Sequence, residues 1–230
     1  MGVHPRAVAL AVPGRPDRAC EDAASCSLQQ DAVVLADGLG SAPMGSLGSH
    51  TAVNLALGPI RDALHAGLAP EHLAKLLADL WERETHGDRD VATTCLFAFI
   101  AGDEVVLGQL GDGLVLAIDR EGQEHRLPAG RGQFGNHTEA LPRGTLHVAR
   151  HPAGSIQSVL LATDGVSDDL IPGTEAQLLT ALVQIAREQG TDALQTQLES
   201  WLTNWRTPAS HDDRSVGVLM LESTDQEQGR

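Results

Sequence analysis

Short apolar runs separated by glycine-rich or acidic turns recur along the chain, and this pattern is typical of buried strands. Three of these runs, between residues 94 and 119, follow one another with short turns and predict an antiparallel meander. The complete set of expected strands covers residues 6–12, 31–36, 94–100, 104–110, 114–119, 145–149, 156–163 and 216–221.

Apolar positions at helical spacing predict helices between these strands. A Gly/Ser-rich loop at 41–48 precedes helical patterns at 51–57 and 60–64, which we expect to be interrupted at Gly58-Pro59 because proline lacks an N–H and clashes with the preceding turn. The clearest helix begins near Pro70, carries its leucines on one face and ends at Gly87.

Two further helical patterns follow one another between residues 174 and 205, whereas residues 121–144 have no period and predict a long surface loop. Helices grouped in pairs between runs of antiparallel strands differ from the β-α-β alternation of a parallel sheet. The pattern therefore predicts an α+β fold in which helices cover the outer faces of antiparallel sheets. We expect one domain over residues 1–222 and a disordered polar tail over 223–230.

Composition narrows the class of protein. Hydrophobic residues make up 42% of the chain and aromatic residues only 3%, so the core is expected to consist of Leu, Val and Ala. A net charge of −15 argues against nucleic acid or an anionic membrane as a partner. Cys20, Cys26 and Cys95 lack metal-type spacing, and no apolar run is long enough for a signal peptide or a membrane span. These features predict a soluble cytoplasmic protein with reduced thiols.

Acidic residues stand at the tips of four expected strands. Three strands run into Asp-Gly pairs, and an acidic cluster precedes the last strand. Asp-Gly is the commonest hairpin turn signal, and Asp112-Gly113 fits a hairpin because a strand follows at once. No returning strand follows Asp37-Gly38 or Asp164-Gly165. If the strand tips converge, their carboxylates would form an all-oxygen site for hard divalent cations.

Six short motifs, taken in order, resemble the metal-dependent protein phosphatases of type 2C, the PPM family, and most of all its compact bacterial branch. The resemblance spans about residues 15–221 and implies an αββα sandwich of two antiparallel sheets flanked by helix pairs. The motifs are Glu21-Asp22, Asp37-Gly38, Thr93-Thr94, Gly111-Asp112-Gly113, Ala162-Thr163-Asp164-Gly165 and Asp212-Asp213-Arg214-Ser215.

The resemblance also implies a centre of two Mn²⁺ or Mg²⁺ ions. Asp37 would bridge the two ions, and the carbonyl of Gly38 would bind the second. Asp164 and Asp212 would hold the first ion. Such a centre activates a water and takes up charge on the phosphoryl group, so hydrolysis of a phosphomonoester needs no Cys or Ser nucleophile.

Further acidic positions complete the set that the resemblance implies. Glu21 and Asp22 would reach the second ion, largely through water, and Asp112 and Asp168 match positions for a third, weaker ion. Thr94 matches a structural threonine beside the site, and residues 135–138 match a flap segment next to the cleft.

Two positions depart from the family pattern. An arginine that binds the substrate phosphate typically stands four residues before the acidic pair, whereas Arg18 lies three and Arg15 six residues before Glu21. We favour Arg18, and a solvated loop charge is the alternative for either. Leu39 occupies the place of a histidine proposed as general acid in many members. Candidate substitutes are His50, His137 and His211, and none is singled out.

The sequence thus favours a serine/threonine phosphoprotein phosphatase acting as a monomer on phosphorylated proteins, with a Ser/Thr kinase as its counterpart. The alternative is a catalytically weak or inactive relative that serves as a metal-stabilised module and binds phosphoproteins or a kinase. The intact carboxylate set disfavours that alternative. An aspartyl-phosphate hydrolase would need an Asp-x-Asp motif, which Asp37-Gly38-Leu39 does not supply.

Overall fold

Two five-stranded antiparallel sheets form the centre of the molecule. The computed structural model describes residues 3–15, 17–130, 138–205 and 211–223. The first sheet consists, in spatial order, of β1 (Val3–Val12), β10 (Arg214–Ser223), β9 (Ile156–Ala162), β6 (Leu114–Asp119) and β7 (Glu124–Arg126). The second consists of β2 (Asp22–Cys26), β3 (Ala32–Asp37), β4 (Cys95–Ala101), β5 (Glu104–Leu110) and β8 (His147–Pro152).

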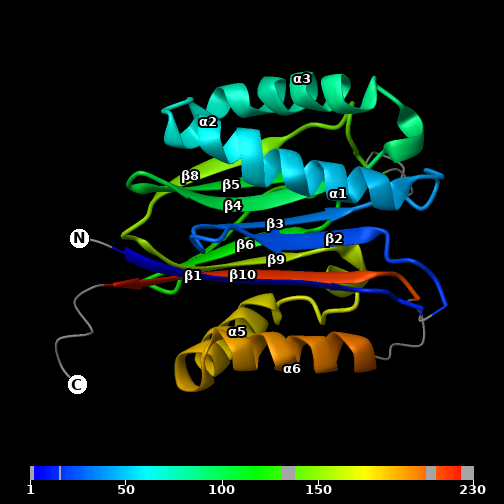
Figure 1. Ribbon diagram of the computed structural model, residues 1–230. Helices are drawn as coiled ribbons and strands as arrows, with labels where there is room; N and C mark the ends of the chain where they lie inside the picture. Colours follow the sequence, from blue (N-terminus) through cyan, green and yellow to red (C-terminus); the bar gives the residue numbers. More distant parts are fainter. Residues whose placement is uncertain (1–2, 16, 131–137, 206–210, 224–230) are drawn as a thin grey trace.

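Helices cover both outer faces, so the molecule has four layers (Figure 1). This arrangement confirms the α+β class and the αββα sandwich. The chain between β3 and β4 contains α1 (Gly45–Leu55), η1 (Ala56–Ile60), α2 (Arg61–His65), η2 (Pro70–His72), α3 (Leu73–Thr85) and η3 (Arg89–Val91), and α1 to α3 lie over the second sheet. The chain between β9 and β10 contains α4 (Asp164–Ser167), α5 (Glu175–Gln189) and α6 (Thr191–Asn204), and α5 and α6 lie over the first sheet.

Three apolar clusters hold the layers together, and they are built mainly from aliphatic side chains, as the composition predicts. Leu35 and Leu161 belong to the cluster between the two sheets. Trp81 packs with the stacked rings of Phe97 and Phe99, whose centroids lie 4.6 Å apart, under α1 to α3. Within the described residues, no helix is both long and apolar enough to cross a lipid bilayer.

The expected meander over 94–119 is wrong in its second half. β4 pairs with β5, but β6 belongs to the other sheet, so the Asp112-Gly113 turn carries the chain from one sheet to the other. Gly111 has a φ of 115°, a conformation that glycine accepts readily. Gln109 fixes the crossing by donating from Nε2 to the carbonyl of Gly113 at 2.7 Å. Apolar strands buried in either sheet look alike in sequence, so spacing alone could not reveal this crossing.

The helix after β3 also differs from the prediction. α1 begins at Gly45, inside the segment expected to be a loop, and the chain stays helical through Pro59 because η1 is a π-helical segment. The glycines that suggested a loop allow backbones to touch. A Cβ on Gly48 would lie 1.9 Å from the carbonyl oxygen of Val91.

Two short strands escape the sequence patterns. β2 contains only small and polar residues and was not predicted, and β7 lies inside the segment expected to be irregular. The expected tail begins at Ser223, which is the last residue of β10, and residues 224–230 lie outside the described part.

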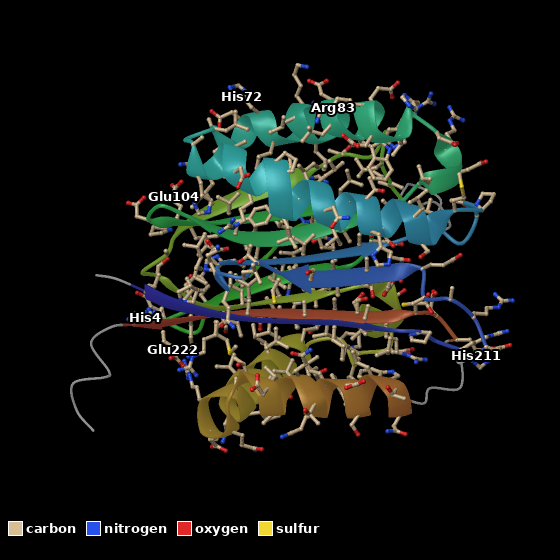
Figure 2. All side chains as sticks on the ribbon, viewed as in Figure 1. His4, His72, Arg83, Glu104, His211 and Glu222 are labelled. Atoms are coloured by element: carbon tan, nitrogen blue, oxygen red, sulfur yellow. The ribbon has the colours of Figure 1, made fainter. Side chains whose placement is uncertain are left out.

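All four expected acidic strand tips lie at the same end of the sandwich. β1 and β10 are paired along their length, from Val3 opposite Ser223 to Val12 opposite Arg214. Figure 2 shows His4 and Glu222 at one end of this pair and His211 at the other. The last residues of β3, β5 and β9 and the first residues of β2 and β10 all lie at the His211 end (Figures 1 and 2).

Candidate metal centre

Antiparallel pairing brings the acidic strand tips together from both sheets. Asp22 and Asp37 are opposite one another on β2 and β3. In the other sheet, Asp164 follows β9 and Asp212 precedes β10, and these two strands are paired. The charges of Asp164 and Asp212 both act on Asp37, so the acidic tips of the two sheets face each other.

Burial and mutual repulsion change the acidity of these carboxyls. Burial raises the pKa of Asp37 well above its ordinary value, and the charges of Asp22 and Asp164 raise it further. Burial and then the charge of Asp212 raise the pKa of Asp164 to about 6. Burial also raises the pKa of Asp212. A bound cation would relieve this repulsion and allow the carboxyls to ionise together.

Asp22 is buried beneath the site and links the two sheets. Its Oδ2 accepts hydrogen bonds from the hydroxyl of Thr163, which directly follows β9, at 2.8 Å and from the hydroxyl of Ser215 on β10 at 2.6 Å. Its buried Oδ1 receives no hydrogen bond from a described N–H or hydroxyl. The carboxyl of Asp37 lies within hydrogen-bonding reach of the Asp22 carboxyl. Burial raises the pKa of Asp22 to about 7. Two carboxyls in this contact require a proton or a cation between them.

The remaining predicted acidic residues surround this group. Glu21 is half-buried, and burial followed by the charges of Asp213 and Asp212 raises its pKa. Asp112 accepts a hydrogen bond from the hydroxyl of Thr138 at 2.6 Å, and its charge acts on both Asp164 and Asp212. The charge of Asp168, an exposed residue at the C-terminal end of α4, also acts on Asp164.

Two threonines fix the backbone at the tip of β3. The N–H of Asp37 donates to the hydroxyl oxygen of Thr94 at 2.9 Å, and the hydroxyl of Thr93 donates to the carbonyl of Asp37 at 2.8 Å. A Cβ on Gly38 would lie 2.3 Å from the carbonyl carbon of Gly45, so the start of α1 packs directly on this turn. The glycine is therefore required by close contact, in addition to the carbonyl role that the motif suggests.

A cavity of about 430 Å³ adjoins Glu21 and Asp212. Both candidate arginines, Arg15 and Arg18, line it, and so does His211. Of the other histidines considered, His50 is exposed on α1, and His137 lies outside the described residues together with most of the expected flap. The rest of the lining consists of Ala19, Pro43, Met44, Gly45, Ser46 and Asp213.

Sequence reasoning did not assign roles to several residues that the structure brings to the site. Ser215 and Thr163 bind Asp22, and the carboxylate of Asp213 accepts from two backbone N–H groups of the segment that carries the arginines. The segment around Met44, expected to be a loop, forms a wall of the cavity. The motifs contain Asp213, Thr163 and Ser215, but their partners lie far away in the chain.

A sequence model described as protein phosphatase 2C matches residues 15–203. The chain belongs to this family. No curated protein sequence gives a significant match. Solved structures of bacterial phosphatases do match, and their low sequence identity means that they bear on the fold alone.

The structural relatives of this protein phosphatase 2C member cover nearly its whole length. The catalytic domain of the serine/threonine protein phosphatase PstP, in complex with two manganese ions, has a TM-score of 0.71 at 19% identity, over 96% of this chain and 100% of the other. Stp1 from Staphylococcus aureus has a TM-score of 0.68 at 17% identity, over 94% of this chain and 95% of the other. The serine/threonine phosphatase of S. agalactiae has a TM-score of 0.68 at 15% identity, over 95% of this chain and 100% of the other.

The donor set of this protein phosphatase 2C member fits a hard divalent cation. Asp37, Asp164 and Asp212 offer carboxylate oxygens, and Asp22 keeps a buried oxygen without a donor. Within the described residues, no group of three or more His, Cys, Asp or Glu side chains is arranged to hold one ion by itself. Mg²⁺ commonly keeps several waters and takes only one or two protein carboxylates, so the two observations are compatible.

Proposed function

We propose that this protein is a Mn²⁺- or Mg²⁺-dependent phosphatase that hydrolyses phosphoserine and phosphothreonine in proteins. The observation that carries the proposal is the convergence of carboxylates from both sheets beside a cavity lined by two arginines. Repelling carboxylates favour divalent cations, and guanidinium groups favour a phosphate. Membership of the protein phosphatase 2C family supports the same reaction class.

In this proposal, Asp37, Asp164 and Asp212 bind two ions, and the Gly38 carbonyl adds an oxygen ligand. Glu21, Asp22, Asp112 and Asp168 surround them as the outer acidic set and include the positions for a third ion. When bound, the ions supply an activated water and neutralise charge on the phosphoryl group.

The protein's own groups orient the substrate. Arg18, with Arg15 beside it on the cavity, is proposed to hold the phosphoryl oxygens. The nearby thiol of Cys20 does not suit a covalent mechanism, because burial and then the charges of Asp213 and Asp22 raise its pKa to about 12. A thiol that stays protonated at neutral pH is a poor nucleophile. This environment supports direct attack by water.

The test is hydrolysis of an aryl phosphate and a phosphopeptide while Mn²⁺ is titrated into metal-free protein. We expect activity to depend on Mn²⁺ and Asp37→Asn to remove it, by at least about 100-fold. Asp79→Asn is the matched control, because Asp79 lies on α3 and its carboxylate is exposed and paired with Lys75. A wild type with no metal-dependent activity on either substrate would contradict the proposal. If Mn²⁺ still bound to such a protein, the regulatory-module alternative would explain the result.

A further inference from the structure

One carboxylate holds both ends of the chain segment that carries the two cavity arginines. Oδ1 of Asp213 accepts from the backbone N–H of Gly14 at 2.7 Å, and Oδ2 accepts from the backbone N–H of Glu21 at 2.5 Å. The two donors bracket Arg15 and Arg18, and Pro16 between them lies outside the described residues. Each oxygen therefore fixes one end of the arginine segment.

The contact at Gly14 is close as well as hydrogen-bonded. A Cβ on Gly14 would lie 2.1 Å from the carbonyl oxygen of Asp212. On the other side, a Cβ on Gly165 would lie 2.0 Å from the carbonyl oxygen of Asp213. The backbone of residues 212–213 thus lies between the arginine segment and the turn next to Asp164. The arginine segment is attached to the same backbone that presents Asp212.

The two arginines are exposed and directed to the cavity rather than to a structural partner. Both arginines line the cavity, and neither forms an ion pair in the described part of the chain. The charge of Arg18 acts on Glu21 and lowers its pKa, against the effect of burial. Arg61 and Arg126, by contrast, are bound to carboxylates. With 31 acidic against 16 basic residues, unpaired arginines on a cavity are available for an incoming anion.

Long arginine side chains lose considerable rotamer entropy when they bind, so their backbone must already be placed correctly for the phosphate contact to be favourable. The backbone N–H of Arg18 donates to the carbonyl of Arg15 at 3.2 Å, which makes the segment a turn that depends on its two ends. An ionised Asp is suited to closing both ends, because both oxygens accept. An Asn offers one acceptor oxygen and one NH₂ donor. One of the two backbone N–H groups would then face the NH₂ group and have no acceptor.

We infer that Asp213 is a positioning residue, which clamps the segment around Arg15 and Arg18 and so holds their guanidinium groups at the phosphate side of the metal centre. This inference rests on the proposed phosphatase function for its catalytic consequence. The clamp itself concerns backbone contacts and phosphate binding, which can be measured separately from turnover.

The experiment compares Asp213→Asn and Asp213→Ala with wild type and with Asp79→Asn, a matched control whose exposed carboxylate lies on α3 and is paired with Lys75. We expect KM for a phosphopeptide to rise about tenfold in Asp213→Asn and more in Asp213→Ala, as for loss of hydrogen bonds to a charged group. The kcat should change less than threefold, and Asp79→Asn should match wild type. In a background that lacks both guanidinium groups, Arg15→Ala with Arg18→Ala, Asp213→Asn should raise KM little further, because the clamp acts through these two arginines.

Two readouts do not depend on turnover. Amide hydrogen exchange at Gly14 and Glu21 should accelerate in Asp213→Asn, and the affinity for inorganic phosphate, measured by calorimetry in Mn²⁺ buffer, should fall about tenfold. Faster exchange with unchanged phosphate affinity would overturn the inference. So would an effect of Asp213→Asn on KM that is undiminished when both Arg15 and Arg18 are alanine. If the wild type lacked activity, the proposed function would fail, and the exchange and phosphate measurements would still decide for or against the clamp.

Discussion

Removing divalent cations and raising the pH should destabilise this protein, because the candidate metal centre is a group of carboxyls with raised pKa values. Asp164 has a pKa of about 6, compared with an ordinary value of about 3.9. Between these two values the native state binds more protons than the unfolded state, so the free energy of unfolding falls as pH rises. The window set by Asp164 runs from about pH 4 to pH 6, and Asp22, with a pKa of about 7, extends it upward.

The expected size follows from the same values. A difference of about two in pKa corresponds to about 3 kcal/mol. Asp164 is only partly buried, so solvent screening reduces the effect, and we expect about 1–2 kcal/mol between pH 5 and pH 7.5 in EDTA. Mn²⁺ at 100 times its dissociation constant should restore about 2.7 kcal/mol at pH 7.5.

Urea unfolding, followed by tryptophan fluorescence at a series of pH values, measures this effect. Asp164→Asn in EDTA is the matched variant, since it cannot gain the charge. The comparison also removes the opposing contribution of His151, whose pKa is lowered by burial and which stabilises the protein as pH rises toward 6.5. If the metal-free wild type did not lose unfolding free energy relative to Asp164→Asn over this range, the argument from carboxyl repulsion would be refuted.

Two further predictions concern glycine packing and the leaving group. Gly48→Ala should lower the free energy of unfolding by about 1–3 kcal/mol, because its Cβ would meet a backbone carbonyl at 1.9 Å. Gly154→Ala, in the turn before β9 and with open space around its Cβ position, should raise this free energy by about 0.4–1 kcal/mol, and equal effects in urea unfolding would contradict the packing argument. With Leu39 in place of a histidine, hydrolysis rates should fall steeply as leaving-group pKa rises. Leu39→His should speed the hydrolysis of an alkyl phosphate by up to roughly 100-fold, the contribution of a general acid, and should change the rate for nitrophenyl phosphate little. A wild-type rate that depends only weakly on leaving-group pKa would count against this prediction.

The sequence predicted those features that depend on local pattern. Buried strands such as β3 and β9 are continuous apolar runs, and the carboxylates at their tips are visible as Asp37 and Asp164. The motif order led to the correct family and to the αββα fold. Local signals are sufficient there because a buried strand and its terminal turn are encoded by adjacent residues.

Features that depend on distant partners could not be predicted. The sheet to which β6 belongs depends on its pairing with β9. The composition of β2 does not indicate a strand, and β2 is one because it pairs with β3. The N–H groups of Gly14 and Glu21 lie 199 and 192 residues from Asp213 in the chain. Gly45 suggested a loop because the close approach of Gly38, which requires a small residue, is not visible in sequence.

The pairing of β1 with β10 has a practical consequence for engineering. Val3 stands opposite Ser223, so the described ends of the chain are neighbours across one strand spacing, about 5 Å, at the end of the sandwich away from His211. A short linker between them could close the chain, and new ends could be opened at the exposed β4–β5 hairpin around Gly102. Such a circular permutant would leave the acidic end untouched. In the unpermuted chain, a fluorescent reporter fused at either end would remain clear of the cavity lined by Arg15 and Arg18.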